Sequence, residues 1–109
     1  IHANVYIGFK TRVGNNNVIA AASSIDHHNV IGDHCLISPG CCTAGVVRIG
    51  SNVVFGTGVH VKNFLRIGDN SVIASGSTVF YNVPPNSAIK ARITRDILPM
   101  KIRELAEND

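Results

Sequence analysis

The stretch Ile25-Asp26-His27-His28 places a carboxylate and two imidazoles next to one another in an otherwise apolar, repetitive sequence. An imidazole can accept a proton near neutral pH, and a nearby carboxylate can orient it and stabilise its protonated form. We therefore take His27 as the candidate general base and Asp26 as the candidate acid that orients it. His28 is the other group that could fix the base. The alternative is that all three side chains form an ordinary solvated corner.

A six-residue repeat determines how these side chains are presented. Of the fourteen hexads from Ile1 to Pro84, thirteen open with an apolar residue, and no charged residue occupies the first or fifth position. All ten glycines fall at positions two, three or four of a hexad. Neither the spacing of an amphipathic helix nor the alternation of a simple strand fits this pattern. A repeat this short predicts a solenoid.

The hexads predict an all-β fold, a parallel β-helix with three hexads in each coil. The first and fifth positions would point inward, and positions two to four would form the corners. Val-Gly or Ile-Gly recurs every eighteen residues, at 13, 31, 49 and 67, which supports the three-hexad coil. Residues eighteen apart then lie above one another, so His27 falls between Phe9 and Gly45.

The solenoid is expected to end where two prolines remove backbone donors that a strand ladder needs. The domain organisation predicted is therefore residues 1–84 as the β-helix and residues 85–109 as a connecting segment with a short helix. That helix, expected from about residue 93 to residue 107, would cap the open last coil.

Composition restricts the partners and the compartment. The chain has 109 residues, 45% of them hydrophobic, and a formal net charge of +3. It is long enough for one small domain and has no apolar run of membrane-spanning length. Its basic residues lack the aromatic-basic pattern of a nucleic-acid module, so we expect no nucleic-acid partner. We expect a cytoplasmic protein in which Cys35 and Cys41 point inward, Cys42 points outward, and all three remain thiols.

Several short motifs resemble those of the hexapeptide-repeat, left-handed β-helix acyltransferases. The likeness is to the sialic acid O-acetyltransferases and nucleotide-linked 4-amino-sugar N-acetyltransferases in particular. The matching residues are Ile1-His2, Asp26-His27 with Val30-Ile31-Gly32, Ala44-Gly45 with Ile49-Gly50, and Ala88-Ile89-Lys90-Ala91-Arg92. The last segment departs from the family pattern Gly-x-Pro-Ala-Lys/Arg.

The resemblance implies an activity and a set of residue roles. The protein would move an acetyl group from acetyl-CoA to an amine or a hydroxyl of a sugar, without a metal. His27 would be the general base, and Gly45 would help hold the oxyanion. Gly58, Lys90 and Arg92 would contribute to binding of coenzyme A. The family also implies a homotrimer, with coenzyme A between subunits, and a sugar-nucleotide domain preceding Ile1.

Two other functions remain open at this point. The β-helix could serve only to trimerise a longer chain. It could also be a metal-dependent enzyme similar to the β-helix carbonic anhydrases, with His27, His34 and His60 as the zinc ligands to consider. The identity of the acceptor and the choice between O- and N-acetylation are not fixed by the sequence.

Overall fold

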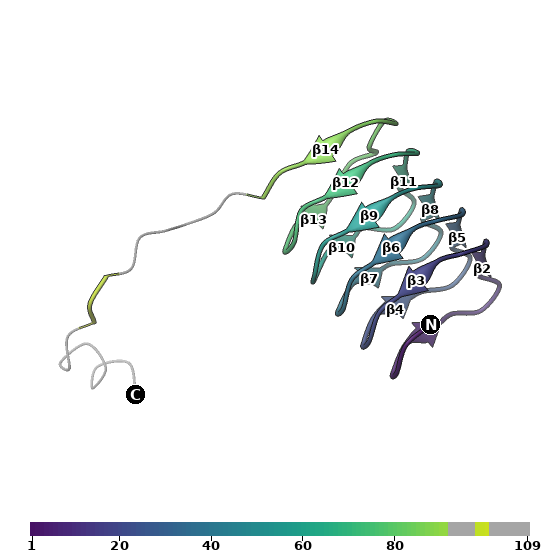
Figure 1. Ribbon diagram of the computed structural model, residues 1–109, viewed down its shortest axis with the longest axis horizontal. Coiled ribbons are helices and arrows are strands. Elements are labelled where there is room, and N and C mark those ends of the chain that lie inside the picture. Colours follow the sequence, from purple (N-terminus) through teal and green to yellow (C-terminus); the bar gives the residue numbers. More distant parts are fainter. Residues whose placement is uncertain (92–97, 101–109) are drawn as a thin grey trace.

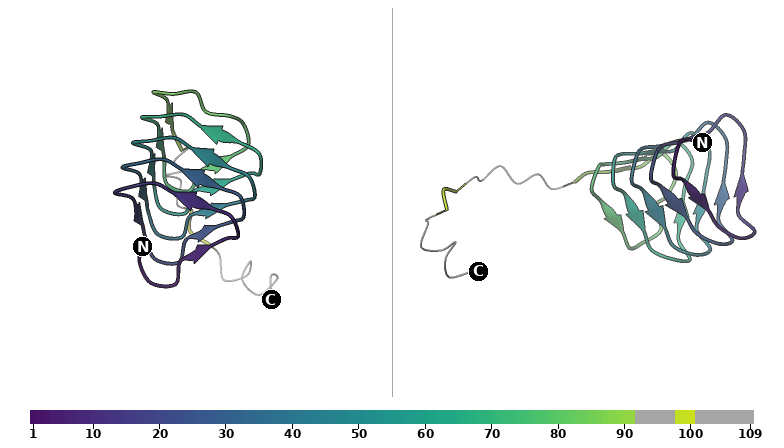
Figure 2. Two further views of the ribbon diagram at one scale, coloured as in Figure 1. Left: turned by 90° about the vertical axis from the view of Figure 1, so that its right-hand side faces the viewer. Right: turned by 90° about the horizontal axis from the view of Figure 1, so that it is seen from below.

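The computed structural model describes residues 1–91 and 98–100. Residues 1–91 form a left-handed parallel β-helix in which three sheets make the sides of a prism (Figure 1). Successive coils stack in chain order from the N-terminal end to β14, as the two further views also show (Figure 2). The predicted fold class and the three-hexad coil are confirmed.

Each strand in this part of the chain has two residues, and from β1 to β13 these are the sixth of one hexad and the first of the next. Sheet A contains β1 (Tyr6–Ile7), β4 (Ser24–Ile25), β7 (Cys42–Thr43), β10 (His60–Val61) and β13 (Thr78–Val79). Sheet B contains β2 (Arg12–Val13), β5 (Val30–Ile31), β8 (Arg48–Ile49) and β11 (Arg66–Ile67). Sheet C contains β3 (Val18–Ile19), β6 (Leu36–Ile37), β9 (Val54–Phe55), β12 (Val72–Ile73) and β14 (Ala88–Ile89).

The core consists of the inward first and fifth positions, as predicted. In sheet C, for example, Ile19, Ile37, Phe55 and Ile73 follow one another in register and are at most 1% exposed. Removing these side chains from water is the main stabilising contribution that so thin a solenoid can make.

The cysteines take the predicted directions. Cys35 and Cys41 are buried, and Cys42 is partly exposed on sheet A. Burial raises the pKa of both inward thiols, so they act as small apolar groups.

The fourth position of a hexad is where the chain turns through the left-handed region. Asn16, Asn52 and Asn70 have φ between 56° and 58° there, and Gly40, Gly58 and Gly76 have φ between 70° and 76°. Asparagine and glycine tolerate this conformation best. The corner requirement therefore falls on one position and not on all of positions two to four.

The solenoid continues past the predicted boundary at residue 84. β14 pairs with β12, and Val83 forms a bridge with Ile67. Both pairings join residues sixteen apart, whereas the other coils pair residues eighteen apart. The corner after Val79 is two residues shorter, and this moves Pro84 and Pro85 into the next turn, where no ladder donor is needed.

The three outward faces differ in chemistry. Sheet A presents polar side chains between Tyr6 and Thr78, and sheet B presents three arginines and Val30. Sheet C presents Val18, Leu36, Val54, Val72 and Ala88, of which Val18, Leu36 and Val72 are 40%, 42% and 49% exposed. A continuous apolar column is therefore in contact with solvent on one side of the prism.

Arg92 lies outside the described residues. So does the predicted C-terminal helix, apart from residues 98–100. Among the described residues, no helix has the length and apolar character needed to cross a membrane.

Candidate active site

The Asp26-His27-His28 corner connects β4 of sheet A to β5 of sheet B, and hydrogen bonds fix its backbone. The Asp26 carboxylate accepts a hydrogen bond of 2.7 Å from the His27 N–H. The buried Asn29 side chain donates to the carbonyls of His27, at 3.0 Å, and of Ala44 in the next coil, at 2.9 Å. The main chain that carries His27 is therefore held in place while its side chain is exposed.

The His27 imidazole lies directly over Gly45, one coil further along the prism. A Cβ atom added to Gly45 would lie 2.5 Å from Nε2 and 2.6 Å from Cε1 of His27. The φ angle of Gly45 is not in the left-handed region, so the backbone conformation does not require glycine there. The missing side chain is what allows the ring to occupy this position.

Gly8, one coil before the corner, likewise leaves room for it by lacking a side chain. A Cβ atom on Gly8 would lie 2.6 Å from both the Asp26 carbonyl carbon and the His27 backbone nitrogen. The corner is thus enclosed between two glycines, one that admits its backbone and one that admits its imidazole.

His28, and not Asp26, contacts the His27 ring. The two Nδ1 atoms of His27 and His28 are 3.0 Å apart, and the Asp26 carboxylate instead accepts from the backbone. The expected bond between Asp26 and the imidazole is not formed, because adjacent side chains diverge while the His28 conformation turns its ring back. Since one Nδ1 must donate and the other accept, His27 has a free Nε2 lone pair when its own Nδ1 carries the proton.

The same corner has unusual residues in the left-handed position. Lys10, His28, Val46 and Phe64 occupy it, with φ between 54° and 64°, where the other two corners mostly use asparagine and glycine. A β-branched or bulky residue there is a backbone outlier, and such strain concentrates at functional sites. Val46 and Phe64 are such outliers, and they lie on the same edge of the prism as His28.

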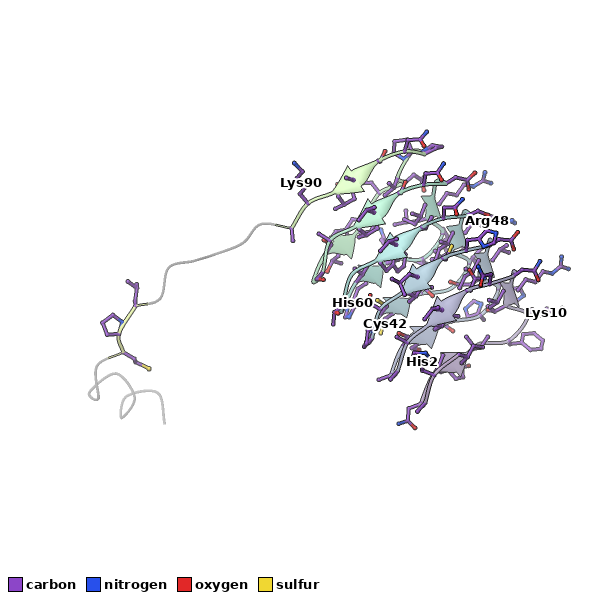
Figure 3. The ribbon with its side chains drawn as sticks, viewed as in Figure 1. His2, Lys10, Cys42, Arg48, His60 and Lys90 are labelled. Atoms are coloured by element: carbon purple, nitrogen blue, oxygen red, sulfur yellow. The ribbon has the colours of Figure 1, made fainter. Side chains whose placement is uncertain are left out.

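The other described residues predicted to bind coenzyme A or a metal do not lie at the His27 corner. Gly58 is at the corner between sheets C and A, and Lys90 follows β14 at the opposite end of the prism from His2 (Figure 3). Arg92 lies outside the described residues. His34 is at the corner between sheets B and C and bonds Asn16, whereas His60 lies on sheet A. Within the described part of the chain, no three metal-ligating side chains gather at one point.

Two residues of the site were not expected from the sequence. Asn29 is a polar residue at an inward fifth position of the His27 hexad, and Gly8 lies one coil before Asp26. The signal that could have found them is the eighteen-residue register, which places Gly8 under the corner and leaves Asn29 beside it.

Family comparison agrees with the repeat. Residues 46–80 match the model of the bacterial transferase hexapeptide (six repeats), and the resemblance to hexapeptide-repeat acyltransferases is confirmed. Relatives include the acyl-[acyl-carrier-protein]–UDP-N-acetylglucosamine O-acyltransferases of Helicobacter pylori and Agrobacterium fabrum. The H. pylori protein is 31% identical over 91% of this chain and 37% of its own length. The A. fabrum protein is 37% identical over 72% of this chain and 29% of its own length. The matches thus span only about a third of the length of these acyltransferases.

Solved structures share the fold. Serine acetyltransferase isoform 3 of Entamoeba histolytica matches with a TM-score of 0.75 and 20% identity, over 91% of this chain and 39% of that one. The acetyltransferase domain of PglB from Neisseria gonorrhoeae matches with a TM-score of 0.65 and 20% identity, over 80% of this chain and 49% of that one. Perosamine N-acetyltransferase of Caulobacter crescentus, solved with CoA and GDP-perosamine, matches with a TM-score of 0.51 and 22% identity, over 85% of this chain and 54% of that one.

Substitution of Gly8 and of Gly45 by alanine should lower the free energy of unfolding by different amounts. Gly8→Ala places a methyl group against backbone that cannot move, so the free energy of unfolding should fall by about 3 kcal/mol. Gly45→Ala meets only an exposed ring that can swing into solvent, so the fall should stay below about 1 kcal/mol. Urea unfolding of both variants measures the difference. Equal losses for the two variants would contradict the described packing of the His27 ring.

Proposed function

We propose that the chain is the catalytic β-helix of an acetyltransferase that moves an acetyl group from acetyl-CoA to an amine or a hydroxyl of a sugar. The observation that carries the proposal is the His27 ring held over Gly45, with Nδ1 paired to His28 and Nε2 unpaired among the described residues. A β-helix that only trimerised a longer chain would not need a glycine cleared for one imidazole, or strained residues along one edge.

In this proposal Nε2 of His27 accepts the proton of the acceptor N–H or O–H as that atom attacks the thioester carbonyl. The carbon–sulfur bond then breaks, and the protonated His27 returns the proton to the departing thiolate. The Gly45 N–H has no hydrogen-bond acceptor among the described residues, which supports its assignment to the oxyanion of the tetrahedral intermediate.

Asp26 and His28 would divide the positioning of the base between them. Asp26 accepts from the His27 backbone N–H, and the two imidazole Nδ1 atoms are in hydrogen-bond contact. In this proposal His27 Nδ1–H is the donor and His28 Nδ1 the acceptor. That bond fixes the tautomer that a base at Nε2 requires, and it persists when His27 becomes protonated.

A second candidate donor follows from the relatives. Those of H. pylori and A. fabrum are named for an acyl-carrier-protein substrate, whereas perosamine N-acetyltransferase was solved with CoA. Both kinds of donor carry the acyl group as a thioester on a phosphopantetheine arm, so the chemistry at His27 is the same. Gly58, Lys90 and Arg92 would contribute to binding of either donor, in a groove between two subunits.

We further propose that the protein is a homotrimer in the cytoplasm. The exposed apolar column of sheet C, from Val18 to Ala88, supports self-association because so continuous a patch is unfavourable in water. The free thiols Cys35, Cys41 and Cys42 agree with a reducing compartment, which cell fractionation would test.

Light scattering tests the trimer. The wild-type chain should have the mass of three chains at micromolar concentration, and Leu36→Glu should lower it to the mass of one. Thr78→Glu on the polar face of sheet A is the matched control and should leave the trimer intact. A wild-type monomer would remove both the trimer and any site shared between subunits.

Enzyme kinetics test the function. His27→Ala should lower kcat/KM for acetyl transfer by about 10²–10⁴-fold, the usual range for loss of a general base. The melting temperature should change little, since the side chain is exposed. His34→Ala, at a different corner, is the control and should keep wild-type turnover.

Ligand binding separates this function from its two rivals. Acetyl-CoA or an acyl carrier thioester should raise the melting temperature by mass action, whereas zinc should not. Near-normal turnover by folded His27→Ala would show that the catalytic assignment is wrong. Stabilisation by zinc alone would favour the metal enzyme, and stabilisation by none of the three ligands would favour the trimerising module.

A further inference from the structure

A cationic groove of about 710 Å³ runs along sheet B beside the His27 corner. Its lining includes Lys10, Arg12 and Arg48 together with the His28 ring. Lys10 and Arg48 lie on the same side of the prism in Figure 3. The groove therefore collects three of the six cations in residues 1–91.

The strand register explains how the arginines come to face one another. Arg12 pairs with Val30 and Val30 with Arg48, so a short side chain lies between the two guanidinium groups. With strands about 4.8 Å apart, the two arginine backbones are separated by about 10 Å. Long arginine side chains can converge from that distance on one phosphate group or a pair of them.

Nothing in the described chain neutralises this row of charge. Its three carboxylates, on Asp26, Asp33 and Asp69, each accept a hydrogen bond from a backbone N–H at a corner. Arg48 and Arg66 are direct register neighbours, an arrangement of like charges that destabilises a sheet. Arginine that is placed without an acid partner is suited to bidentate binding of phosphate.

The groove also leads to the proposed base. His28 is part of its lining and is joined to His27 through the 3.0 Å contact between their Nδ1 atoms. The Lys10 ammonium is held 5.4 Å from the centre of the Phe9 ring, and that ring contacts His28 edge-on. An anion bound in the groove would thus bring the rest of its molecule to the His27 corner.

We propose that this groove binds the phosphate groups of a ligand that reacts at His27, an inference that rests on the proposed function. Two sources share this chemistry. One is the phosphopantetheine or coenzyme A part of the donor, and the other is the diphosphate of a nucleotide-linked acceptor. In either case Arg12 and Arg48 make the phosphate contacts, and Arg66, outside the lining, does not.

Titration with inorganic pyrophosphate, followed by calorimetry at low salt, tests the groove on the full chain. Arg12→Gln and Arg48→Gln should each weaken binding about tenfold, and the effect should shrink in high salt as charge is screened. Arg66→Gln is the matched control, with the same residue change on the same face, and should alter affinity less than about twofold. Melting temperatures should not fall, since the changes at Arg48 and Arg66 remove a like-charge pair and Arg12 has no acidic partner among the described residues.

The same variants identify the source of the phosphate. Weaker binding of coenzyme A with unchanged binding of uridine diphosphate assigns the groove to the donor, and the reverse assigns it to the acceptor. Unchanged affinity of Arg12→Gln and Arg48→Gln for all three probes would overturn the proposal, as would an equal loss in Arg66→Gln.

The groove and the proposed function can fail separately. His27→Ala should bind pyrophosphate like the wild type. If that variant also kept full turnover, the base assignment would fall, whereas arginine-dependent pyrophosphate binding would still support a phosphate groove.

Discussion

The parallel pairing of residues eighteen apart is the constraint on which the rest of the structure depends. It places every side chain of one coil directly above its counterpart in the next, at the spacing of a strand ladder. Through this register Ile19, Ile37 and Phe55 form one core column, Arg12 and Arg48 form one surface row, and the His27 ring finds Gly45 beneath it. A shift of one residue would turn each of these sets to the opposite face of its sheet, inward side chains outward and outward ones inward.

Two kinds of corner are built on this frame. At the other two corners of the prism, most residues in the left-handed position are asparagine or glycine, and these residue types suit the turn. At the corner between sheets A and B, Val46 and Phe64 adopt the same conformation, which is unfavourable for a β-branched or bulky residue. The groove along sheet B begins at this corner, so the strained backbone, the proposed base His27 and the cations lie along one edge.

Much of this arrangement could be predicted from the sequence, because a strict period fixes both the core and the vertical neighbours. The inward positions of Cys35 and Cys41 and the stacking of His27 on Gly45 follow from counting in sixes and eighteens. The partner of the His27 ring could not be predicted, since it depends on the turn conformation of His28 and on side-chain rotamers. The shortened last corner was hidden because Val83 is apolar and fits the unbroken period as well as the shifted one. The row of cations in the groove is predictable too, because the register alone aligns Arg12, Arg48 and Arg66.

The central claim is that His28 keeps the proton of neutral His27 on Nδ1, so that Nε2 over Gly45 is free to act as the base. The most direct measurement is the ¹⁵N chemical shift of each imidazole nitrogen of His27 at a pH where the ring is neutral. The account predicts a protonated Nδ1 and an unprotonated Nε2, with the Nδ1 proton shared with His28. A His27 ring protonated on Nε2 would contradict it, because that nitrogen could not then accept a proton from the acceptor.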